Sequence, residues 1–315
     1  MADLKLINMR DVEVESVSWL WYPFIPYGKV TIIQGDPGDG KTTLVLQIIA
    51  RLTKGESIID EKEQSPINVI YQTAEDGLAD TIKPRLLSAD ADCSKVLVID
   101  DRDTPLTMRD VRLEQAIVET NAKLVVLDPI QGFLGADVDM HRANEIRPIM
   151  KHISELAEKY KCAIILIGHM NKCSVGKSAY RGLGSIDFQA AARSVLIVGR
   201  IKDEPEVRVV CQTKSSLAPE AKAVAFRLNE ETGFEWIGEL DITADDLLSG
   251  TVKGTKKQTA MDFLEKLLAD GQMAQTEIIE LARQKGISDK TLRNAKDELK
   301  IKSKRVNNQW HWSFD

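Results

Sequence analysis

Apolar, β-branched runs alternate with amphipathic stretches along the first 240 residues of the chain. Most of these runs are apolar at consecutive positions, which is typical of strands buried on both faces of a largely parallel sheet. The stretches between them have the periodicity of crossover helices. The pattern therefore predicts an α/β fold with a doubly wound sheet. The predicted strands are 29–34, 67–73, 95–100, 124–128, 163–168, 194–199 and 207–213, and the predicted helices are 42–54, 108–121 and 144–161.

The later part of the chain has a different pattern. The segment "VAFRLNEETGFEWIG" predicts a hairpin that closes the sheet, with a turn near 231–233. The stretch "LLSGTVKGTKKQ" offers little to bury and indicates a linker over 247–258, after a large domain over 1–246.

A small domain is predicted over 259–315. Three helical patterns, 259–269, 275–285 and 289–299, precede "IKSKRVNNQWHWSFD", which predicts two short strands around an Asn307–Asn308 turn. Three helices and a hairpin in this length are the outline of a winged helix-turn-helix. Trp310 and Trp312, two apart on one strand face, are expected in its core.

Composition adds one contrast to this picture. The net charge is −6, but residues 251–315 hold 13 Lys and Arg against 9 Asp and Glu, a difference of +4, so the first 250 residues carry −10. A basic unit after an acidic one raises the question of a nucleic-acid contact.

Other totals narrow the class of protein. The four cysteines form no CxxC pair, which argues against a zinc site or a disulfide framework. The N-terminus lacks the apolar region of a signal peptide, and no apolar run reaches the roughly 18 residues of a membrane span. We expect a soluble, cytoplasmic protein without membrane contact.

The segment "GDPGDGKTT" matches the phosphate-binding pattern G-x-x-x-x-G-K-[ST] between a predicted strand and a predicted helix. Its backbone N–H groups and the helix N-terminus suit phosphate. Lys41 would reach the β- and γ-phosphates of ATP, and the Thr42 hydroxyl would bind Mg²⁺. The predicted nucleotide-binding residues are Gly35, Asp36, Pro37, Gly38, Asp39, Gly40, Lys41, Thr42 and Thr43.

Asp128 closes the strand "KLVVLD", where a second Mg²⁺ contact is expected. The next residue is Pro129, so no glutamate follows to activate water. Glu75 in "NVIYQTAEDG" comes just after the strand that follows the P-loop helix. The carboxyl ends of neighbouring parallel strands share one edge, so Glu75 is a candidate base. The local sequence leaves a solvated turn equally open, because Asp-Gly favours turns.

Together, the P-loop, Glu75, an aspartate without a following glutamate and a later "IGHMNK" resemble the RecA/DnaB superfamily. Over roughly residues 15–230 the chain looks most like plasmid RepA-type hexameric helicases and related phage or mobile-element ATPases. The resemblance implies a RecA-like fold, ATP and Mg²⁺ as cofactors, and a ring, most simply a hexamer. It also implies that Glu75 is the catalytic glutamate.

The same resemblance implies two further catalytic roles. His169, at the end of the strand "AIILIGH", matches the residue that senses the γ-phosphate; a packed histidine is the alternative. Arg193 falls where RepA-type helicases place an arginine finger that reaches the neighbouring subunit's nucleotide. A helix-capping arginine is the alternative. DnaB-like relatives carry a later K-x-R, but this chain has "KSS" there, which leaves Lys214 without the arginine.

Two Gly-rich loops, 132–144 and 171–185, follow successive strands and are too long for simple connections. The second combines cations with an aromatic residue, which is what single-strand binding uses. The resemblance implies that both loops face a central channel, whereas a mobile surface loop is the alternative. The predicted DNA-binding residues of the second loop are Lys172, Lys177, Tyr180 and Arg181.

The predicted recognition helix 289–299 has Ser288 as its N-cap. Phosphate contacts from its cations and from the wing would make DNA binding salt-dependent. A protein-binding domain with a solvated basic face is the alternative. The candidate DNA contacts are Lys290, Arg293, Lys296, Lys304 and Arg305.

These observations predict a ring-forming ATPase that moves along single-stranded DNA. The expected work is that of a replicative helicase, with a possible replication-initiation protein as a further partner. A recombinase-like ATPase that binds DNA without unwinding it, and an ATP-gated regulator, are the alternatives.

Overall fold

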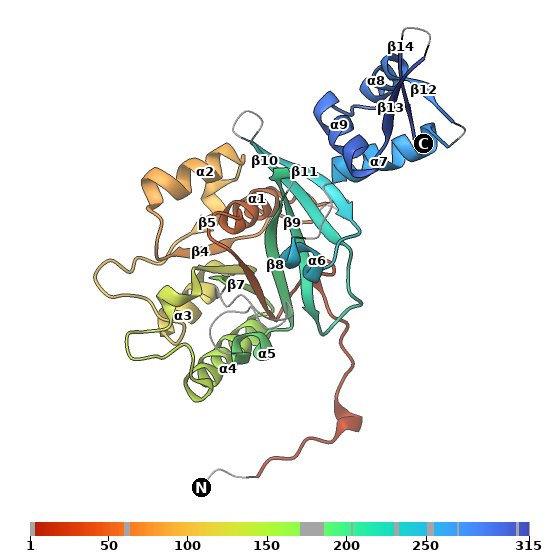
Figure 1. Ribbon diagram of the computed structural model, residues 1–315. Helices are drawn as coiled ribbons and strands as arrows, with labels where there is room; N and C mark the ends of the chain where they lie inside the picture. The colour runs from red at the N-terminus through yellow and green to blue at the C-terminus, as the bar shows by residue number, and fades with distance from the viewer. Residues whose placement is uncertain are drawn as a thin grey trace. The chain divides into compact units, whose positions relative to one another are not determined.

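The computed structural model describes residues 4–59, 64–170, 186–202, 204–229, 233–250, 255–269, 271–306 and 309–314 (Figure 1). The chain separates into two compact units. The first comprises Met1–Arg200 and Glu206–Leu248, and the second comprises Ile201–Pro205 and Ser249–Asp315.

The first unit is built on one sheet, whose described strands follow the order β11-β10-β9-β8-β3-β7-β6-β4-β5. The strands from β8 to β5 pair in parallel, and β10 pairs antiparallel with β9 and β11. The bounds are β3 Val30–Gly35, β4 Val69–Thr73, β5 Val96–Leu97, β6 Leu124–Asp128, β7 Ala163–His169, β8 Ser194–Ile201, β9 Glu204–Ser215, β10 Ala223–Asn229 and β11 Gly233–Leu240.

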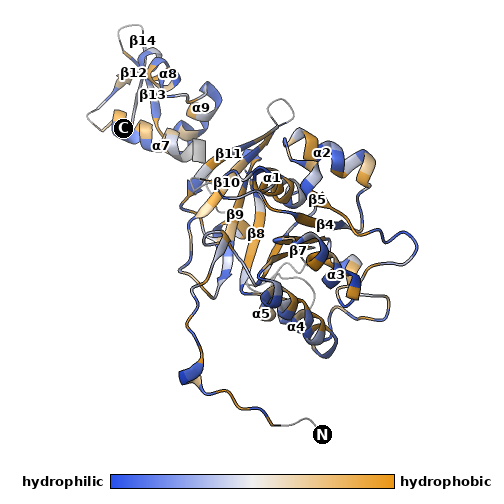
Figure 2. Ribbon diagram, turned by 180° about the vertical axis from the view of Figure 1, so that it is seen from behind, coloured by the Kyte–Doolittle hydropathy of each residue, from blue (hydrophilic) through white to orange (hydrophobic). Residues whose placement is uncertain are grey.

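Helices cover both faces of this sheet, which confirms the predicted doubly wound α/β architecture. Side chains alternate along each strand, so Ile33 joins the cluster under α1 and α2, whereas Ile32 joins the cluster under α3, α4 and α5. Figure 2 shows hydrophobic central strands beside helices that carry hydrophilic residues. The helices are α1 Lys41–Lys54, α2 Lys83–Ser88, α3 Val111–Thr120, α4 Ala143–Tyr160 and α5 Ile186–Ala191.

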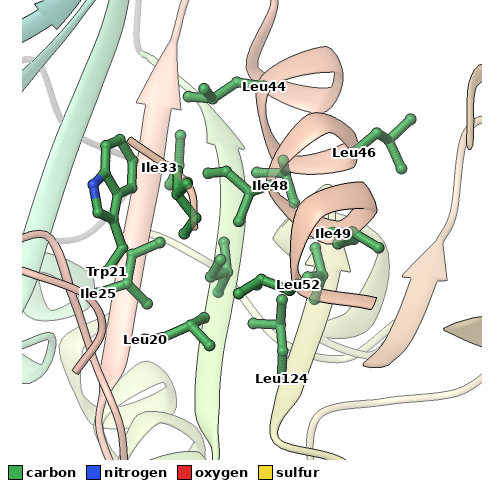
Figure 3. Packing of buried hydrophobic residues seen from close by; sticks show 14 of the residues in the cluster. Leu20, Trp21, Ile25, Ile33, Leu44, Leu46, Ile48, Ile49, Leu52 and Leu124 are labelled. Atoms are coloured by element: carbon green, nitrogen blue, oxygen red, sulfur yellow. The ribbon is translucent and has the colours of Figure 1, made fainter. Parts of the chain in front are cut away.

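Helix α1 packs against the sheet next to β3, the strand that precedes it. Leu44, Ile48 and Leu52 recur at helical spacing and are fully buried against the sheet, close to Ile33 (Figure 3). Burial of each such side chain is worth about 1.5–3 kcal/mol. The loop between β3 and α1 is therefore held at both ends by the core.

The predicted strand over 95–100 is the one that differs most from the structure. Only Val96–Leu97 pair as β5, and a short 3₁₀ turn, Cys93–Lys95, precedes them. Beyond them the Gln72 side chain donates to the Ile99 carbonyl and accepts from the Ile99 N–H, both at 2.9 Å. A side-chain amide thus takes the place of strand pairing at this edge.

Short elements that the sequence pattern did not indicate complete the first unit. A β1–β2 hairpin (Trp19–Trp21 and Ile25–Pro26) packs Trp21 into the core. Leu78–Ile82 form a π-helix before α2, and Met9–Asp11 and Ile130–Phe133 form 3₁₀ turns. Helix α6, Ala244–Ser249, enters the predicted linker 247–258, because Leu247 is buried against Gly199.

The second unit has its own core. Helices α7 (Thr255–Leu267), α8 (Gln275–Gln284) and α9 (Asp289–Glu298) pack with a three-stranded sheet of order β12-β14-β13. Its strands are β12 Met273–Ala274, β13 Lys302–Val306 and β14 Gln309–Ser313. Ser288 caps α9 as predicted, since its side chain accepts from the Thr291 N–H. Helix α7 begins inside the predicted linker, whose residues 251–254 lie outside the described part.

The two tryptophans of β14 do not share one environment. Trp312 is 2% exposed and belongs to the core, whereas Trp310 is 53% exposed. Trp310 lies opposite Arg305 at the end of the hairpin, past the buried residues. The prediction that both form the core is correct for Trp312 and wrong for Trp310.

Within the described residues, no helix combines the length and the apolar character that crossing a membrane requires.

Candidate active site

The carboxyl ends of four parallel strands meet at one edge of the sheet. Gly35 at the end of β3 is in register with His169 at the end of β7, and Thr73 on β4 is in register with Asp128 on β6. The segments that follow these strands therefore lie together, as expected for the ligand crevice of such a sheet.

Glycine is required in the P-loop for two different reasons, seen at Gly40 and Gly35. Gly40 has a φ of +90°, a left-handed conformation in which a side chain would be strained. A Cβ on Gly35 would lie 2.2 Å from the Val198 carbonyl oxygen, which the neighbouring β8 brings close. The loop thus turns tightly into α1, and the backbone N–H groups at the start of that helix remain available for an anion.

Lys41 is buried at the base of this loop. Its Nζ donates to the carbonyl oxygens of Gly35 at 3.0 Å and Asp36 at 2.8 Å. Burial lowers the pKa of the Lys41 ammonium, and the carboxylates of Asp39 and Asp128 oppose that shift. The side chain is therefore held among acceptors that a phosphate can replace.

An arginine from β8 braces the outer side of the loop. Arg200 donates through Nε to Asp39 Oδ1 at 3.0 Å and through Nη2 to the Gly38 carbonyl. Asp39 also accepts from the Asp36 N–H at 3.1 Å. Burial raises the pKa of the Asp39 carboxyl, and the charge of Arg200 opposes this shift. These contacts thus connect the P-loop to β8, the strand that pairs with β3 on the side away from β7.

Asp128 is 8% exposed and accepts two hydrogen bonds on one oxygen. The Thr42 hydroxyl donates to its Oδ2 at 2.7 Å, and the Tyr71 hydroxyl donates to the same atom at 2.9 Å. Burial raises the pKa of the Asp128 carboxyl, and the two hydrogen bonds oppose that shift. Burial also raises the pKa of the Tyr71 hydroxyl above its usual range, so this group stays a donor.

Glu75 and His169 line the same pocket as this carboxylate. Glu75 Oε2 is 3.9 Å from His169 Nε2, and their side chains are 64% and 37% exposed. His169 Nδ1 is buried and has no hydrogen-bond partner in the described part of the chain. The backbone before Glu75 is fixed, because the Ala74 N–H donates to the Asp128 carbonyl at 2.9 Å.

A pocket of about 350 Å³ joins these groups, a size in the range of small-molecule sites. Asp76 and Arg85 form an ion pair at its rim, with Arg85 Nη1 3.3 Å from Asp76 Oδ2. Leu228 of β10 closes one wall. The other lining residues are Pro37, Gly38, Gly40, Lys41, Thr42, Thr43, Thr73, Glu75, Asp128, Pro129 and His169.

A model of the AAA domain family matches residues 3–175, more than half of the chain. The chain belongs to this family. It is 29% identical over 148 residues to the DNA repair protein RadA of Halalkalibacterium halodurans, which covers 46% of this chain and 28% of RadA. It is 26% identical to protein RecA of Sinorhizobium medicae (253 residues, 73% of this chain and 66% of RecA) and of Agrobacterium fabrum (257 residues, 74% and 67%).

The chain therefore spans less than a third of RadA and about two thirds of RecA. Together with the fold, these matches place it in the RecA-like P-loop ATPase superfamily, as the sequence analysis expected. The narrower resemblance to RepA-type helicases stays a prediction.

The residues of this pocket fit Mg²⁺ and a nucleoside triphosphate. The Thr42 hydroxyl donates a hydrogen bond to Asp128, and its oxygen lone pairs stay available to a cation. No cluster of three or more His, Cys, Asp or Glu side chains that could hold a metal occurs among the described residues. A cation here would thus rely on Thr42, Asp128, phosphate oxygens and water, which suits Mg²⁺.

Arg193 lies away from the pocket of its own chain. It precedes β8, where its N–H donates to the Val30 carbonyl at the start of β3, and its side chain is exposed. Lys214 is close by and donates to the carbonyls of Gln189 and Ala190 at the end of α5. Burial, followed by the charge of Arg193, lowers the pKa of Lys214. Any action of Arg193 on a nucleotide would need a second copy of the chain.

The predicted DNA-binding residues divide into two sets. Lys172, Lys177, Tyr180 and Arg181 lie outside the described residues, so their prediction stays open. In the second unit Lys290, Arg293, Lys304 and Arg305 are exposed. Lys296 is half-buried, with its Nζ 5.1 Å from the centre of the Trp312 ring. It therefore contributes to the core as well as to the surface charge.

Among the lining or bracing residues that were not anticipated are Tyr71, Arg85, Arg200 and Leu228. Two of them carried a signal. A tyrosine in an otherwise apolar buried strand needs a partner for its hydroxyl, and Arg200 ends a strand at the same sheet edge as the P-loop. Arg85 and Leu228 carried none, because their place depends on how α2 and β10 pack.

Proposed function

We propose that this chain is an ATP-dependent motor on single-stranded DNA that works as a ring, most simply a hexamer, and acts as a replicative helicase. The observation that carries the proposal is the position of Glu75 just after β4, where it lines the same pocket as Asp128 and His169. The carboxylate proposed to activate water thus follows a different strand from the one that ends in the proposed metal aspartate. The relatives named RecA and RadA support a DNA-related role.

Each residue of the pocket then has a defined part. Lys41 and the P-loop N–H groups bind the phosphates, and Thr42 with Asp128 holds Mg²⁺, which would neutralise phosphate charge when bound. Glu75 orients water in line with the γ-phosphorus and accepts its proton. A P–O bond forms to water and the bond to the β-phosphate oxygen breaks, which yields ADP and phosphate.

His169 is the proposed link between nucleotide and DNA. It lines the pocket beside Glu75 and comes shortly before the segment with Lys172, Lys177, Tyr180 and Arg181 in the sequence. Release of phosphate would change the partners of His169 and so the position of that segment. Arg193 of a neighbouring copy would complete the site by stabilising transition-state charge.

We also propose that the division at 247–258 separates the motor from a winged-helix domain over 259–315. The exposed cations of α9 and β13, and the exposed Trp310, support a nucleic-acid contact there. A replication-initiation protein is the alternative partner of this surface.

Strand displacement tests the proposal. ATP hydrolysis should rise with single-stranded DNA, and the protein should displace a strand from a forked duplex only with hydrolysable ATP. Light scattering should give the mass of a ring with ATP and DNA present. Hydrolysis that ignores DNA would contradict the motor, and a single-chain mass under all conditions would contradict the ring.

A second function is favoured by the same relatives. A recombinase-like ATPase of DNA repair would also be stimulated by single-stranded DNA, but it would not displace a strand. An ATP-gated regulator would bind DNA in an ATP-dependent way with little stimulation of hydrolysis. The strand-displacement and stimulation measurements therefore separate the three functions.

A further inference from the structure

Tyr71 is a polar-tipped side chain in the middle of an apolar core. It is fully buried on β4, in the same cluster as Ile82 and Leu86 next to α2. Its ring also forms one wall of an apolar cavity of about 380 Å³ between β4, α2 and β5. Such surroundings would accept phenylalanine equally well, so the hydroxyl calls for a separate explanation.

Among the described residues, the Tyr71 hydroxyl has one hydrogen-bond partner, Asp128. The Tyr71 Oη lies 2.9 Å from Asp128 Oδ2, which also accepts from Thr42 Oγ1 at 2.7 Å. Two donors thus meet on one oxygen, and among the described residues no donor forms a hydrogen bond with Oδ1. The carboxylate is held by Oδ2 and keeps Oδ1 for the water shell of a cation.

We propose that Tyr71 is a positioning residue that fixes the Asp128 carboxylate for Mg²⁺. The inference rests on the proposed metal role of Asp128. Thr42 alone leaves the carboxylate free to rotate about one hydrogen bond, and Thr42 must itself bind the cation. Tyr71 adds a second anchor from another element, with a ring that packing keeps in place.

The test compares two losses of a tyrosine–carboxylate hydrogen bond in the full chain. Tyr71→Phe removes the bond to Asp128, and Tyr160→Phe removes a bond of 2.6 Å to Glu114 Oε1 on α3, away from the pocket. Mg²⁺ is titrated while the binding of a fluorescent ADP analogue and the rate of ATP hydrolysis are measured. Melting temperatures are recorded in parallel.

Tyr71→Phe should raise the half-saturating Mg²⁺ concentration about tenfold, the effect typical of lost support for a metal ligand. Binding of the analogue without Mg²⁺ should not change, and kcat at saturating Mg²⁺ should stay close to that of the wild type. Tyr160→Phe should leave the Mg²⁺ dependence unchanged. Replacement of Tyr71 by 4-aminophenylalanine, which keeps a hydrogen-bond donor, should restore the half-saturating Mg²⁺ concentration of the wild type.

An unchanged Mg²⁺ dependence in a folded Tyr71→Phe protein would overturn the inference and leave Tyr71 as a core residue. If 4-aminophenylalanine does not restore a lost Mg²⁺ dependence, the hydrogen bond is not the cause and the inference also fails. A wild-type protein whose nucleotide binding ignores Mg²⁺ would instead overturn the proposed function, on which the inference rests.

Discussion

The two halves of the nucleotide pocket are built differently. On the phosphate side, Lys41, Thr42 and Asp128 are held by short hydrogen bonds within one chain. On the water side, Glu75 and His169 are partly exposed and 3.9 Å apart. The first half is thus held by contacts within the chain, whereas the side chains of the second half are partly exposed.

This difference assigns separate tasks to the two halves. Fixed donors and acceptors recognise a phosphate and a cation without reorganisation, so they determine affinity. In the proposed mechanism, the exposed groups gain their orientation only when a ligand or a neighbouring copy closes over them, so they would determine when hydrolysis occurs. Arg193, exposed at the opposite edge of the sheet, is the group that a neighbouring copy would bring. The predictions below separate affinity from turnover.

Glu75→Gln is expected to have the largest effect. Loss of the base should lower kcat by roughly 10²–10⁴-fold, while nucleotide affinity stays within about twofold. Hydrolysis measured with saturating single-stranded DNA, together with nucleotide binding, checks this. Asp76→Asn, which changes the adjacent carboxylate paired with Arg85, is the matched control and should lose far less. DNA-stimulated hydrolysis that survives in Glu75→Gln would show that the base lies elsewhere.

Lys41→Ala should act on affinity first. Removal of a buried ammonium from the P-loop should weaken nucleotide binding about 100-fold, as expected for a charged hydrogen-bond partner of phosphate. Lys54→Ala, at the other end of α1 and paired with Glu56 and Asp90, is the control. Titration with a fluorescent nucleotide measures both variants. Equal affinities of the two variants would contradict the role of Lys41.

The two halves of the pocket differ in how far the sequence predicts their positions. The P-loop and Asp128 were predictable because a local motif and the end of a hydrophobic strand determine them. Glu75 needed the resemblance as well, since its local sequence also reads as a turn. The contacts of Tyr71 and Arg200 join residues 57 and 161 positions apart. They depend on the order of strands in the sheet, which a single sequence does not reveal.

The fold shows the same limit. Buried central strands such as Leu124–Asp128 were predicted to the residue, because their apolar runs are continuous. The edge strand was predicted too long, because its pattern cannot show that Gln72 replaces the ladder at Ile99. Trp310 and Trp312 share a strand face, so only the length of the hairpin beyond the core separates them.

Arg200→Ala should have a smaller effect on the fixed half. Loss of the brace on Asp39 and Gly38 should loosen the P-loop and weaken nucleotide binding by about three- to tenfold, since the ion pair is partly exposed. Arg227→Ala removes a comparable pair with Glu235 on the sheet and is the control. Nucleotide titrations of the Arg200→Ala and Arg227→Ala proteins measure the two affinities. A loss of nucleotide affinity as large as that of Lys41→Ala would mean that Arg200 contacts the nucleotide itself.

The smallest effect is expected in the second unit. Lys304→Ala and Arg305→Ala should each weaken binding of single-stranded DNA by a few-fold and lower the slope of log affinity against log salt by about 0.7–1. Lys266→Ala, on the last turn of α7, serves as a charge-matched control. Anisotropy titrations at several salt concentrations measure the slope. Unchanged slopes in both variants would favour a protein partner for this surface.

A mixing experiment tests the shared site most directly. Glu75→Gln and Arg193→Ala chains should each be nearly inactive with single-stranded DNA. In mixed assemblies, a site with Glu75 from one chain and Arg193 from its neighbour is complete. The account predicts that mixing the two variants restores hydrolysis well above the sum of the separate rates. Rates that merely add, or an Arg193→Ala protein that hydrolyses ATP normally as an assembly, would contradict it.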